Sequence, residues 1–313
     1  MQQAFDLLIY GLTTSSVTWI SLIFVFGLLV GSFLNVVIHR VPIMLDREWR
    51  SQAEAVLREG VADDQEPSAS QKEEVAPARY NLVVPRSACV KCGALITASQ
   101  NIPVISYLLL KGKCAKCGVR ISPRYPVVEL STAILSALVA WKFGITWYTG
   151  AALFLTWTLI ALSGIDIDHQ ILPDNMTLPL VWIGLLLSLA GAVPGIGLPV
   201  DPRSSIIGAV AGYLSLWSLY HLFKAATGKE GMGYGDFKLY AALGAWLGWQ
   251  MLLLIILLSA FTGAVVGIAL IVTRGRDRNI PIPFGPYLAA AGWIALMWGQ
   301  ALVGSYMRIS GLH

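Results

Sequence analysis

The sequence predicts an all-α polytopic membrane protein with about eight transmembrane helices and a four-cysteine loop between the first two. Of the 313 residues, 56% are hydrophobic and only 13% are charged, a balance that excludes an ordinary soluble globular domain. Apolar runs close to the roughly 20 residues that a membrane helix needs recur along the chain. All four cysteines fall in the single long polar interval between two such runs.

Eight apolar segments are predicted as membrane helices, and because the sixth is short the total is seven or eight. They are residues 17–38, 126–143, 147–167, 174–194, 204–224, 237–249, 250–273 and 284–305. Basic residues cluster after the first, fifth and seventh segments, whereas the opposite connections hold only Lys142 and Arg203. The positive-inside rule therefore places the N-terminus outside and the loop of residues 39–125 in the cytoplasm.

The chain is predicted to have three parts: a first membrane helix (1–38), a cytoplasmic loop (39–125) and a membrane-embedded region (126–313). Within the loop, residues 43–80 are mixed in charge and poor in apolar residues, which predicts a solvated helix followed by a flexible insertion. Basic residues exceed acidic ones in the loop by four, which suits an anionic lipid surface. Acidic residues are interspersed and no aromatic-basic platform is present, so a nucleic-acid partner is not expected.

The first helix carries small residues on one face. Gly27, Gly31 and Asn35 recur at every fourth position and so lie on the same side of the helix. Small residues allow close helix packing, and the Asn35 amide is expected to form a hydrogen bond across the contact.

The loop contains two C-x-x-C pairs, Cys89 with Cys92 and Cys114 with Cys117, each followed by glycine. This spacing is close to that of structural zinc sites, in which four thiolates surround the ion as a tetrahedron. The alternative is a pair of disulfides, which a reducing cytoplasm disfavours. Residues 101–110, between the pairs, are too apolar for a free loop and are expected to lie in the membrane interface.

Carboxylates are scarce in the membrane region, and two groups of them lie where apolar runs meet water. Asp166 ends the third predicted helix, with Asp168 and Asp174 just beyond it, and Asp236 follows the turn Gly231–Gly235. An ionisable group at the edge of hydrocarbon needs a partner or a function. Asp174 precedes a helix and is expected to be its N-cap. Glu129 is expected either to pair with Arg124 or to lie near the site.

Two facing carboxylates cannot both ionise at low cost and would share one proton, one acting as general base on water and the other as general acid. Glycines 231, 233 and 235 are expected to give the turn unusual backbone conformations and to admit an extended substrate strand. The prolines at 281, 283 and 286 favour an extended stretch that either borders this cleft or is only a stiff connector. The alternative use of such carboxylates is a proton or ion path in a transporter, but they are not at mid-membrane and no inverted repeat is evident.

Several stretches together resemble the bacterial type IV prepilin peptidase family. They are GSFLNVVIHRVP (31–42), CVKC (89–92), NIPVISYLLLKGKC (101–114), CAKC (114–117), ISPRYPVVEL (121–130), IDIDHQILPD (165–174), TGKEGMGYGDFKL (227–239) and PIPFGPYLA (281–289). They extend over almost the whole chain apart from residues 43–80. Presenilin-like and signal-peptide peptidases share the GxGD turn, but the Pro-Ala-Leu element expected after the second aspartate in them is not found.

The resemblance implies an inner-membrane aspartic peptidase that removes the leader of prepilins and type II secretion pseudopilins and N-methylates the new terminus with S-adenosylmethionine. It implies that Asp166 and Asp236 are the catalytic pair, and it favours Asp166 over Asp168. It also implies that Cys89, Cys92, Cys114 and Cys117 bind zinc. Gly112 resembles a glycine that the family links to methyl transfer. Glu230, Asp168 and Asp174 are hypothesised to contact the basic leader.

Overall fold

The computed structural model describes residues 15–61, 80–97, 99–191, 198–274 and 282–311. Within these ranges the regular elements are helices without a β-strand, which confirms the all-α prediction. The α-helices are α2 (Ser16–Val61), α3 (Ile105–Leu109), α4 (Arg124–Phe143), α5 (Trp147–His169), α6 (Asp174–Ala190), α7 (Pro202–Thr227), α8 (Tyr234–Leu247), α9 (Leu252–Arg274) and α10 (Gly285–Ile309). Two short 3₁₀ helices, η1 (Ser99–Asn101) and η2 (Trp249–Met251), complete the set.

Each predicted membrane segment coincides with a helix, but the helices differ in their ability to span a bilayer. Six of those described, α2, α4, α5, α7, α9 (with η2) and α10, are long and apolar enough to cross a membrane. The other two, α6 with 17 residues and α8 with 14, are shorter than a full span. The protein is thus a multi-pass membrane protein, while eight crossings stay a prediction.

The first helix is much longer than its apolar segment. α2 has 46 residues and continues through Pro42 to Val61, whereas the predicted membrane helix ended at residue 38. The apolar pattern does end there, but the following residues are good helix formers and extend the helix into the polar region. An ion pair of 2.9 Å between Arg50 and Asp46, one turn apart, fits the expected solvated helix. The remainder of the predicted insertion, residues 62–79, lies outside the described residues.

Glycine contacts bring the helices together. On α2, a Cβ at Gly27 would lie 2.8 Å from Cα of Ala133, and one at Gly31 would lie 2.6 Å from Cα of Glu129. The predicted packing face is therefore confirmed, with α4 as its partner. The Asn35 amide donates to the Tyr125 carbonyl at 3.1 Å, as expected. Gly208 and Gly244 likewise let the backbones of α7 and α8 touch.

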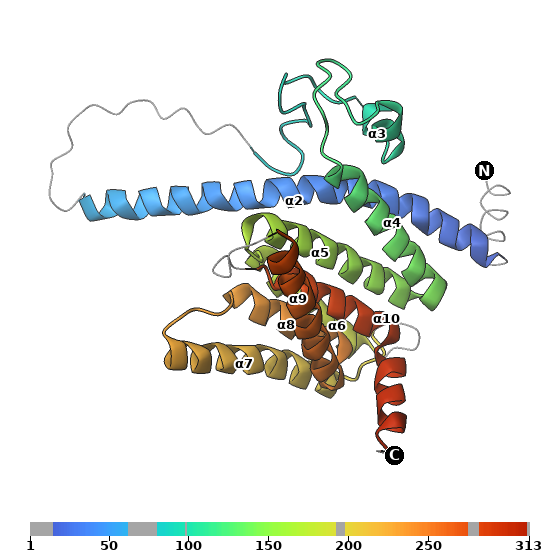
Figure 1. Ribbon diagram of the computed structural model, residues 1–313, viewed down its shortest axis with the longest axis vertical. Helices are drawn as coiled ribbons and strands as arrows, with labels where there is room; N and C mark the ends of the chain where they lie inside the picture. Colours follow the sequence, from blue (N-terminus) through green and yellow to red (C-terminus); the bar gives the residue numbers. More distant parts are fainter. Residues whose placement is uncertain (1–14, 62–79, 98, 192–197, 275–281, 312–313) are drawn as a thin grey trace.

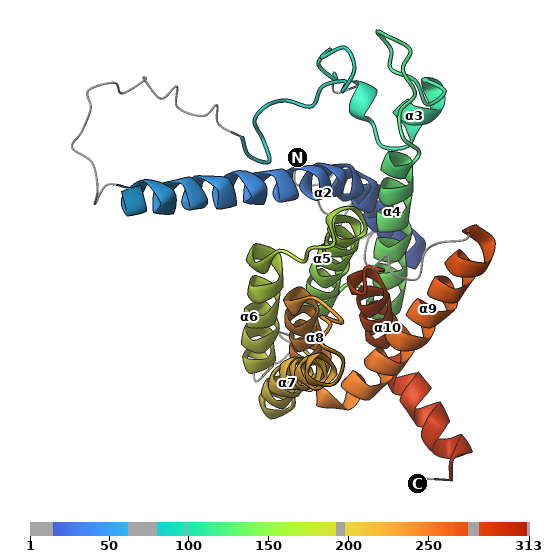
Figure 2. The same cartoon turned by 60° about the vertical axis from the view of Figure 1, so that its left-hand side comes forward.

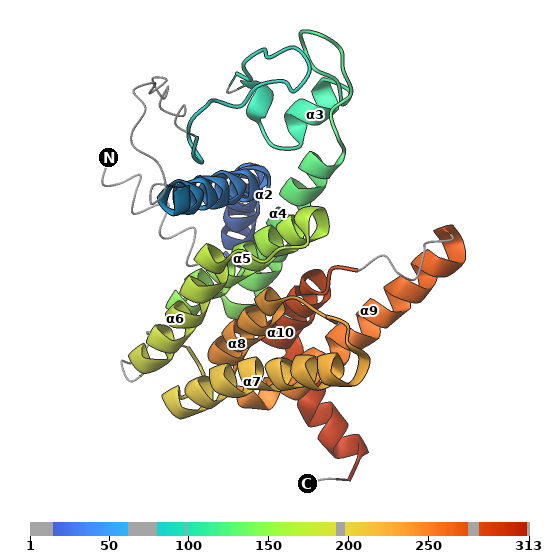
Figure 3. The same ribbon diagram turned by 90° about the vertical axis from the view of Figure 1, so that its left-hand side faces the viewer.

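Several helix ends meet at one end of the bundle. The cysteine loop with α3 lies at the start of α4, and the end of α10 lies at the opposite end of the molecule (Figure 1, Figure 2 and Figure 3). Side chains at the start of α4 contact the end of α5, and side chains at the starts of α6 and α8 contact each other. The start of α10 in turn contacts the end of α5. The cysteine loop and both candidate aspartates therefore share one end of the protein.

Candidate active site and metal centre

Asp166 is placed by the last turn of α5. That helix ends at His169 because Gln170 adopts a left-handed conformation (φ 54°), and the Gln170 amide donates to the Asp166 carbonyl at 2.9 Å. The Asp166 side chain is only 6% exposed. Its Oδ2 accepts a hydrogen bond of 3.0 Å from the backbone amide of Gly285, the first residue of α10. Amides at a helix start lack helical partners and favour a carboxylate.

Asp236 is placed by the first turn of α8 and is also 6% exposed. Its backbone amide donates to the carbonyl of Gly233, the residue that precedes the helix, at 3.2 Å. Its side-chain Oδ1 is buried and has no hydrogen-bond partner among the described residues. Such an oxygen calls for a functional explanation, because buried polar atoms are nearly always paired.

The two carboxylates lie in one buried site and interact electrostatically. Leu172, in the link between α5 and α6, packs between the two helix starts that surround them. A Cβ at Gly235 would lie 2.6 Å from Cβ of Leu172, and a Cβ at Gly285 would lie 2.7 Å from Asp166 Oδ2. A side chain at either position would therefore push Leu172 or the Asp166 carboxylate out of its place.

The glycine-rich turn differs from its prediction in one respect. None of Gly231, Gly233 and Gly235 has a positive φ, so the expectation of unusual backbone conformations is wrong. Gly233 is extended (φ −83°, ψ 152°), and Gly235 is needed for close packing against Leu172. The contact of Gly285 with Asp166 does support the idea that the proline-rich stretch borders the site; residues 275–281 lie outside the described residues.

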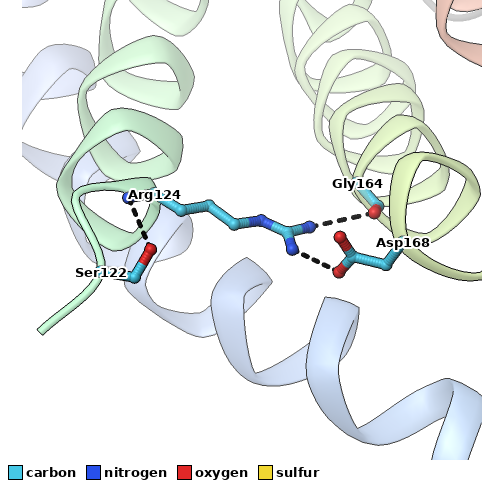
Figure 4. Close-up of polar contacts among 4 residues, drawn as sticks. All are labelled: Ser122, Arg124, Gly164 and Asp168. Atoms are coloured by element: carbon cyan, nitrogen blue, oxygen red, sulfur yellow. Dashed lines mark hydrogen bonds and ion pairs between the residues drawn. The ribbon is translucent and has the colours of Figure 1, made fainter. Parts of the chain in front are cut away.

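The neighbouring acidic residues all have basic partners within the chain. Asp168 forms an ion pair with Arg124, whose guanidinium also donates to the Gly164 carbonyl at 3.0 Å (Figure 4). Asp174 pairs with Lys238 at 2.5 Å, and Glu230 pairs with Lys224 at 2.8 Å. A basic leader would have to share these carboxylates with the cations already present.

The N-cap expected at Asp174 is wrong, and so is the first of the two alternatives for Glu129. Asp174 is not an N-cap: Pro173 holds that position and no side chain caps α6, because the Asp174 carboxylate is directed to Lys238. Arg124 does not pair with Glu129. The buried Glu129 accepts a hydrogen bond of 2.8 Å from the Val104 amide instead, and so holds the turn before α3.

The four cysteines form one cluster in which all Sγ atoms lie within 4.8 Å of one another. All four are free thiols, and Cys89 and Cys117 are 3.8 Å apart at sulfur. Neighbouring sulfurs around a tetrahedral zinc ion, with metal–sulfur bonds of about 2.3 Å, are about 3.8 Å apart. The donor set therefore fits a zinc ion.

The two cysteine turns repeat the same geometry. Gly93 and Gly118 have φ of 67° and 68°, and their amides donate to the carbonyls of Cys89 and Cys114 at 2.9 Å. A positive φ favours glycine at the position after each pair. The amides of Cys92 and Lys91 lower the pKa of the Cys89 thiol to about 6. The amides of Cys117 and Lys116 also lower the pKa of Cys114. The first cysteine of each turn thus favours the thiolate, the form that binds metal. Against the effect of the Val119 amide, burial and the neighbouring thiols raise the pKa of Cys117 to about 11.

Gly112 lies in the turn that precedes the second cysteine pair. Its φ is 65°, and a Cβ there would lie 2.9 Å from the hydroxyl oxygen of Tyr107. Its amide donates to the Tyr107 carbonyl at 2.9 Å, and its carbonyl accepts from Ile121 at 2.8 Å. Any side chain at position 112 would disturb this turn.

Two family models together match about three quarters of the chain. The model described as the bacterial peptidase A24 N-terminal domain matches residues 25–143, and that of the type IV leader peptidase family matches residues 153–268. A relative from Aeromonas salmonicida is 54% identical over 289 residues, which are 92% of this chain and 94% of the relative. The chain belongs to the type IV leader peptidase family.

Other members of the family are similarly close. A relative from Pseudomonas aeruginosa is 53% identical over 91% of this chain and 92% of its own length. One from Xanthomonas campestris is 46% identical over 92% of this chain and 94% of its own length. All three carry the name prepilin leader peptidase/N-methyltransferase. No solved structure matches the chain.

Sequence reasoning missed two contacts of the leader peptidase site. The Gly285 amide could not be identified because a backbone donor leaves no residue type to recognise. The sequence pattern offers Glu129, five residues from Arg124 on the same helix, as one possible partner, whereas the actual partner, Asp168, is 44 residues away.

Proposed function

We propose that this chain cleaves the leader peptide from type IV prepilins and type II secretion pseudopilins and N-methylates the new N-terminal residue. The observation that carries the proposal is the pair of buried carboxylates, Asp166 and Asp236, in a chain of the leader peptidase family. The test is incubation of membranes containing the protein with a prepilin, followed by mass spectrometry of the product. Removal of the leader and gain of a methyl group are the expected results.

Asp166 and Asp236 form the proposed catalytic pair. With one proton between them, the ionised carboxylate takes a proton from the attacking water and the protonated one gives its proton to the leaving amine. The Gly285 amide orients the Asp166 carboxylate, and the unpartnered Oδ1 of Asp236 is available for the shared proton or the substrate. Burial of both groups excludes bulk water from the reacting atoms.

The site is proposed to face the cytoplasm in the bacterial inner membrane, with the N-terminus in the periplasm and residues 126–313 as the peptidase domain. The excess of basic residues in 39–125 supports this orientation. A prepilin has a short basic leader followed by an apolar helix, so its scissile bond lies at the same membrane interface. Lipid contacts the long apolar helices. The alternative is a non-catalytic membrane transporter or a secretion-assembly scaffold with a zinc docking module. Proton-coupled flux in liposomes without peptide cleavage would favour that alternative.

The four cysteines are proposed to bind a structural zinc ion, which would hold the two turns together. Replacing Cys92 with serine removes one of four thiolates and is expected to lower the bound zinc from about one per chain to a small fraction. Metal analysis of the purified protein is the measurement, with Lys116→Ser, in the other turn, as the control. Protein that contains no zinc and no free thiols would favour disulfides and contradict the site.

Gly112 is proposed to serve methyl transfer from S-adenosylmethionine, which supplies the methyl group when bound. Gly112→Ala is expected to lower methylation about tenfold or more while cleavage stays within about twofold. The reason is that the alanine side chain would collide with Tyr107, at a position whose positive φ already disfavours any side chain. Gly118→Ala is the matched control: its φ is 68°, but no atom lies within 4 Å of the added Cβ. Equal loss of methylation in both variants would assign the effect to backbone strain and not to this position.

A further inference from the structure

We propose that Arg124 is a positioning residue for peptide cleavage, which holds the last turn of α5, and with it Asp166, against the start of α4. The proposal rests on the proposed role of Asp166 in catalysis. Arg124 is the first residue of α4 and follows the cysteine loop directly, with Pro123 before it. Its contacts therefore join the loop end of α4 to the helix that carries the first catalytic aspartate.

The contact has two acceptors on one helix. The Arg124 guanidinium is in ion-pair contact with Asp168 and donates to the carbonyl of Gly164 at 3.0 Å (Figure 4). Gly164 and Asp168 are four residues apart and so lie on the same side of α5, one turn from each other. A planar guanidinium that bonds to both acceptors fixes the rotation of that turn about the helix axis and its position along the axis. The ammonium group of a lysine, which acts as a point charge, would not fix both.

Asp166 lies between these acceptors in sequence and on the opposite side of the helix. A step of two residues turns an α-helix by about 200°. The turn is thus held from both sides, by Arg124 on one and by the Gly285 amide at Asp166 on the other. A rotation of α5 that broke the Arg124 contact would move the Asp166 carboxylate away from Gly285 and from Asp236.

The ion pair is not expected to act through stability. The Arg124 and Asp168 side chains are 38% and 29% exposed, and ion pairs at such sites contribute little to folding. On this side Ile38 of α2 also packs against Gly164, through apolar atoms that leave the helix free to turn more easily than a hydrogen bond would. The expected consequence of losing Arg124 is a misplaced carboxylate in a folded protein, since displacements near 1 Å cost up to about a hundredfold in rate.

The test is the rate of prepilin cleavage, with kcat and KM determined separately, in Arg124→Gln, Arg124→Lys, Asp168→Arg and the exchanged pair Arg124→Asp/Asp168→Arg. We expect kcat to fall about tenfold or more in Arg124→Gln and in Asp168→Arg, with KM changed less than about twofold and the thermal unfolding temperature kept. Arg124→Lys should be intermediate, and the exchanged pair should regain at least about threefold over the Asp168→Arg variant. Arg50→Gln, which breaks the exposed pair with Asp46 on α2, is the matched control and should equal the wild type.

Cleavage by Arg124→Gln within twofold of the wild type would overturn the proposal, as would an exchanged pair no more active than either single variant. If Arg124→Gln does not accumulate in membranes, comparison of Asp168→Arg with the exchanged pair decides by the same criterion. Asp166→Asn separates this proposal from the assignment of the catalytic pair. An active Asp166→Asn would remove the basis of both, whereas an inactive Asp166→Asn beside a fully active Arg124→Gln would refute only the role of Arg124.

Discussion

Replacing either Asp166 or Asp236 with asparagine should lower prepilin cleavage by about 10³-fold or more, whereas Asp168→Asn should stay within about tenfold of the wild type. Asparagine keeps the shape of the side chain but cannot carry the shared proton. Asp166 and Asp236 are buried in one site, whereas Asp168 points to Arg124, and an asparagine there still offers an oxygen to the guanidinium. The measurement is the initial rate of cleavage in membranes with matched expression.

The three variants also distinguish the alternatives. If Asp168→Asn is inactive and Asp166→Asn still cleaves, the partner of Asp236 is Asp168 and not Asp166. The shared-proton chemistry would stand in that case. Cleavage by all three would refute the aspartic mechanism and favour a transporter or scaffold. A parallel assay of methylation on a peptide that already lacks its leader is the control for folding, since the proposed mechanism uses the pair for cleavage only.

Residue type and position along the chain were sufficient to predict helices at the apolar segments and the cluster of four cysteines, whereas the catalytic pair stays a prediction. Apolar length predicts a helix wherever the chain crosses hydrocarbon, because a bilayer leaves backbone groups no other partner. The four cysteines were predictable because thiolate pairs at this spacing have few other uses, and their sulfurs do cluster. Asp236 and the group of aspartates at 166–174 could be singled out because a carboxylate at a helix end beside hydrocarbon needs a partner or a function. The choice of Asp166 over Asp168 came from the family resemblance.

Tertiary contacts account for what was missed. The end of α2 was placed at residue 38 because hydrophobicity marks the membrane boundary and not the end of a helix. The partners of Asp174 and Arg124 lie on other helices, at Lys238 and Asp168, and no local pattern shows which helix ends will meet. Gly235 was predicted from backbone freedom, yet its role is to let Leu172 approach, a contact that depends on the whole bundle.

The contact between Gly285 and Asp166 leads to a second large expected effect, a loss of activity without a loss of stability. In Gly285→Ala the added Cβ would lie 2.7 Å from Asp166 Oδ2 and 3.2 Å from Leu172 Cδ1, so the carboxylate must move. We expect kcat for cleavage to fall about 10- to 100-fold, as a displaced reacting group requires. The backbone of Gly285 does not have a positive φ, so alanine is tolerated at the start of α10, and the thermal unfolding temperature should not fall.

Gly304→Ala, near the other end of α10, is the matched control, because nothing lies within 4 Å of a Cβ at that position. Alanine in a helix interior is favoured over glycine by about 0.5–1 kcal/mol, so this variant should be slightly more stable and fully active. Full activity of Gly285→Ala would show that Asp166 has room to move without harm and that the Gly285 amide is not what orients it. Equal losses in both variants would instead point to the helix as a whole. Only a loss confined to position 285, with stability kept, assigns the effect to the carboxylate that this amide holds.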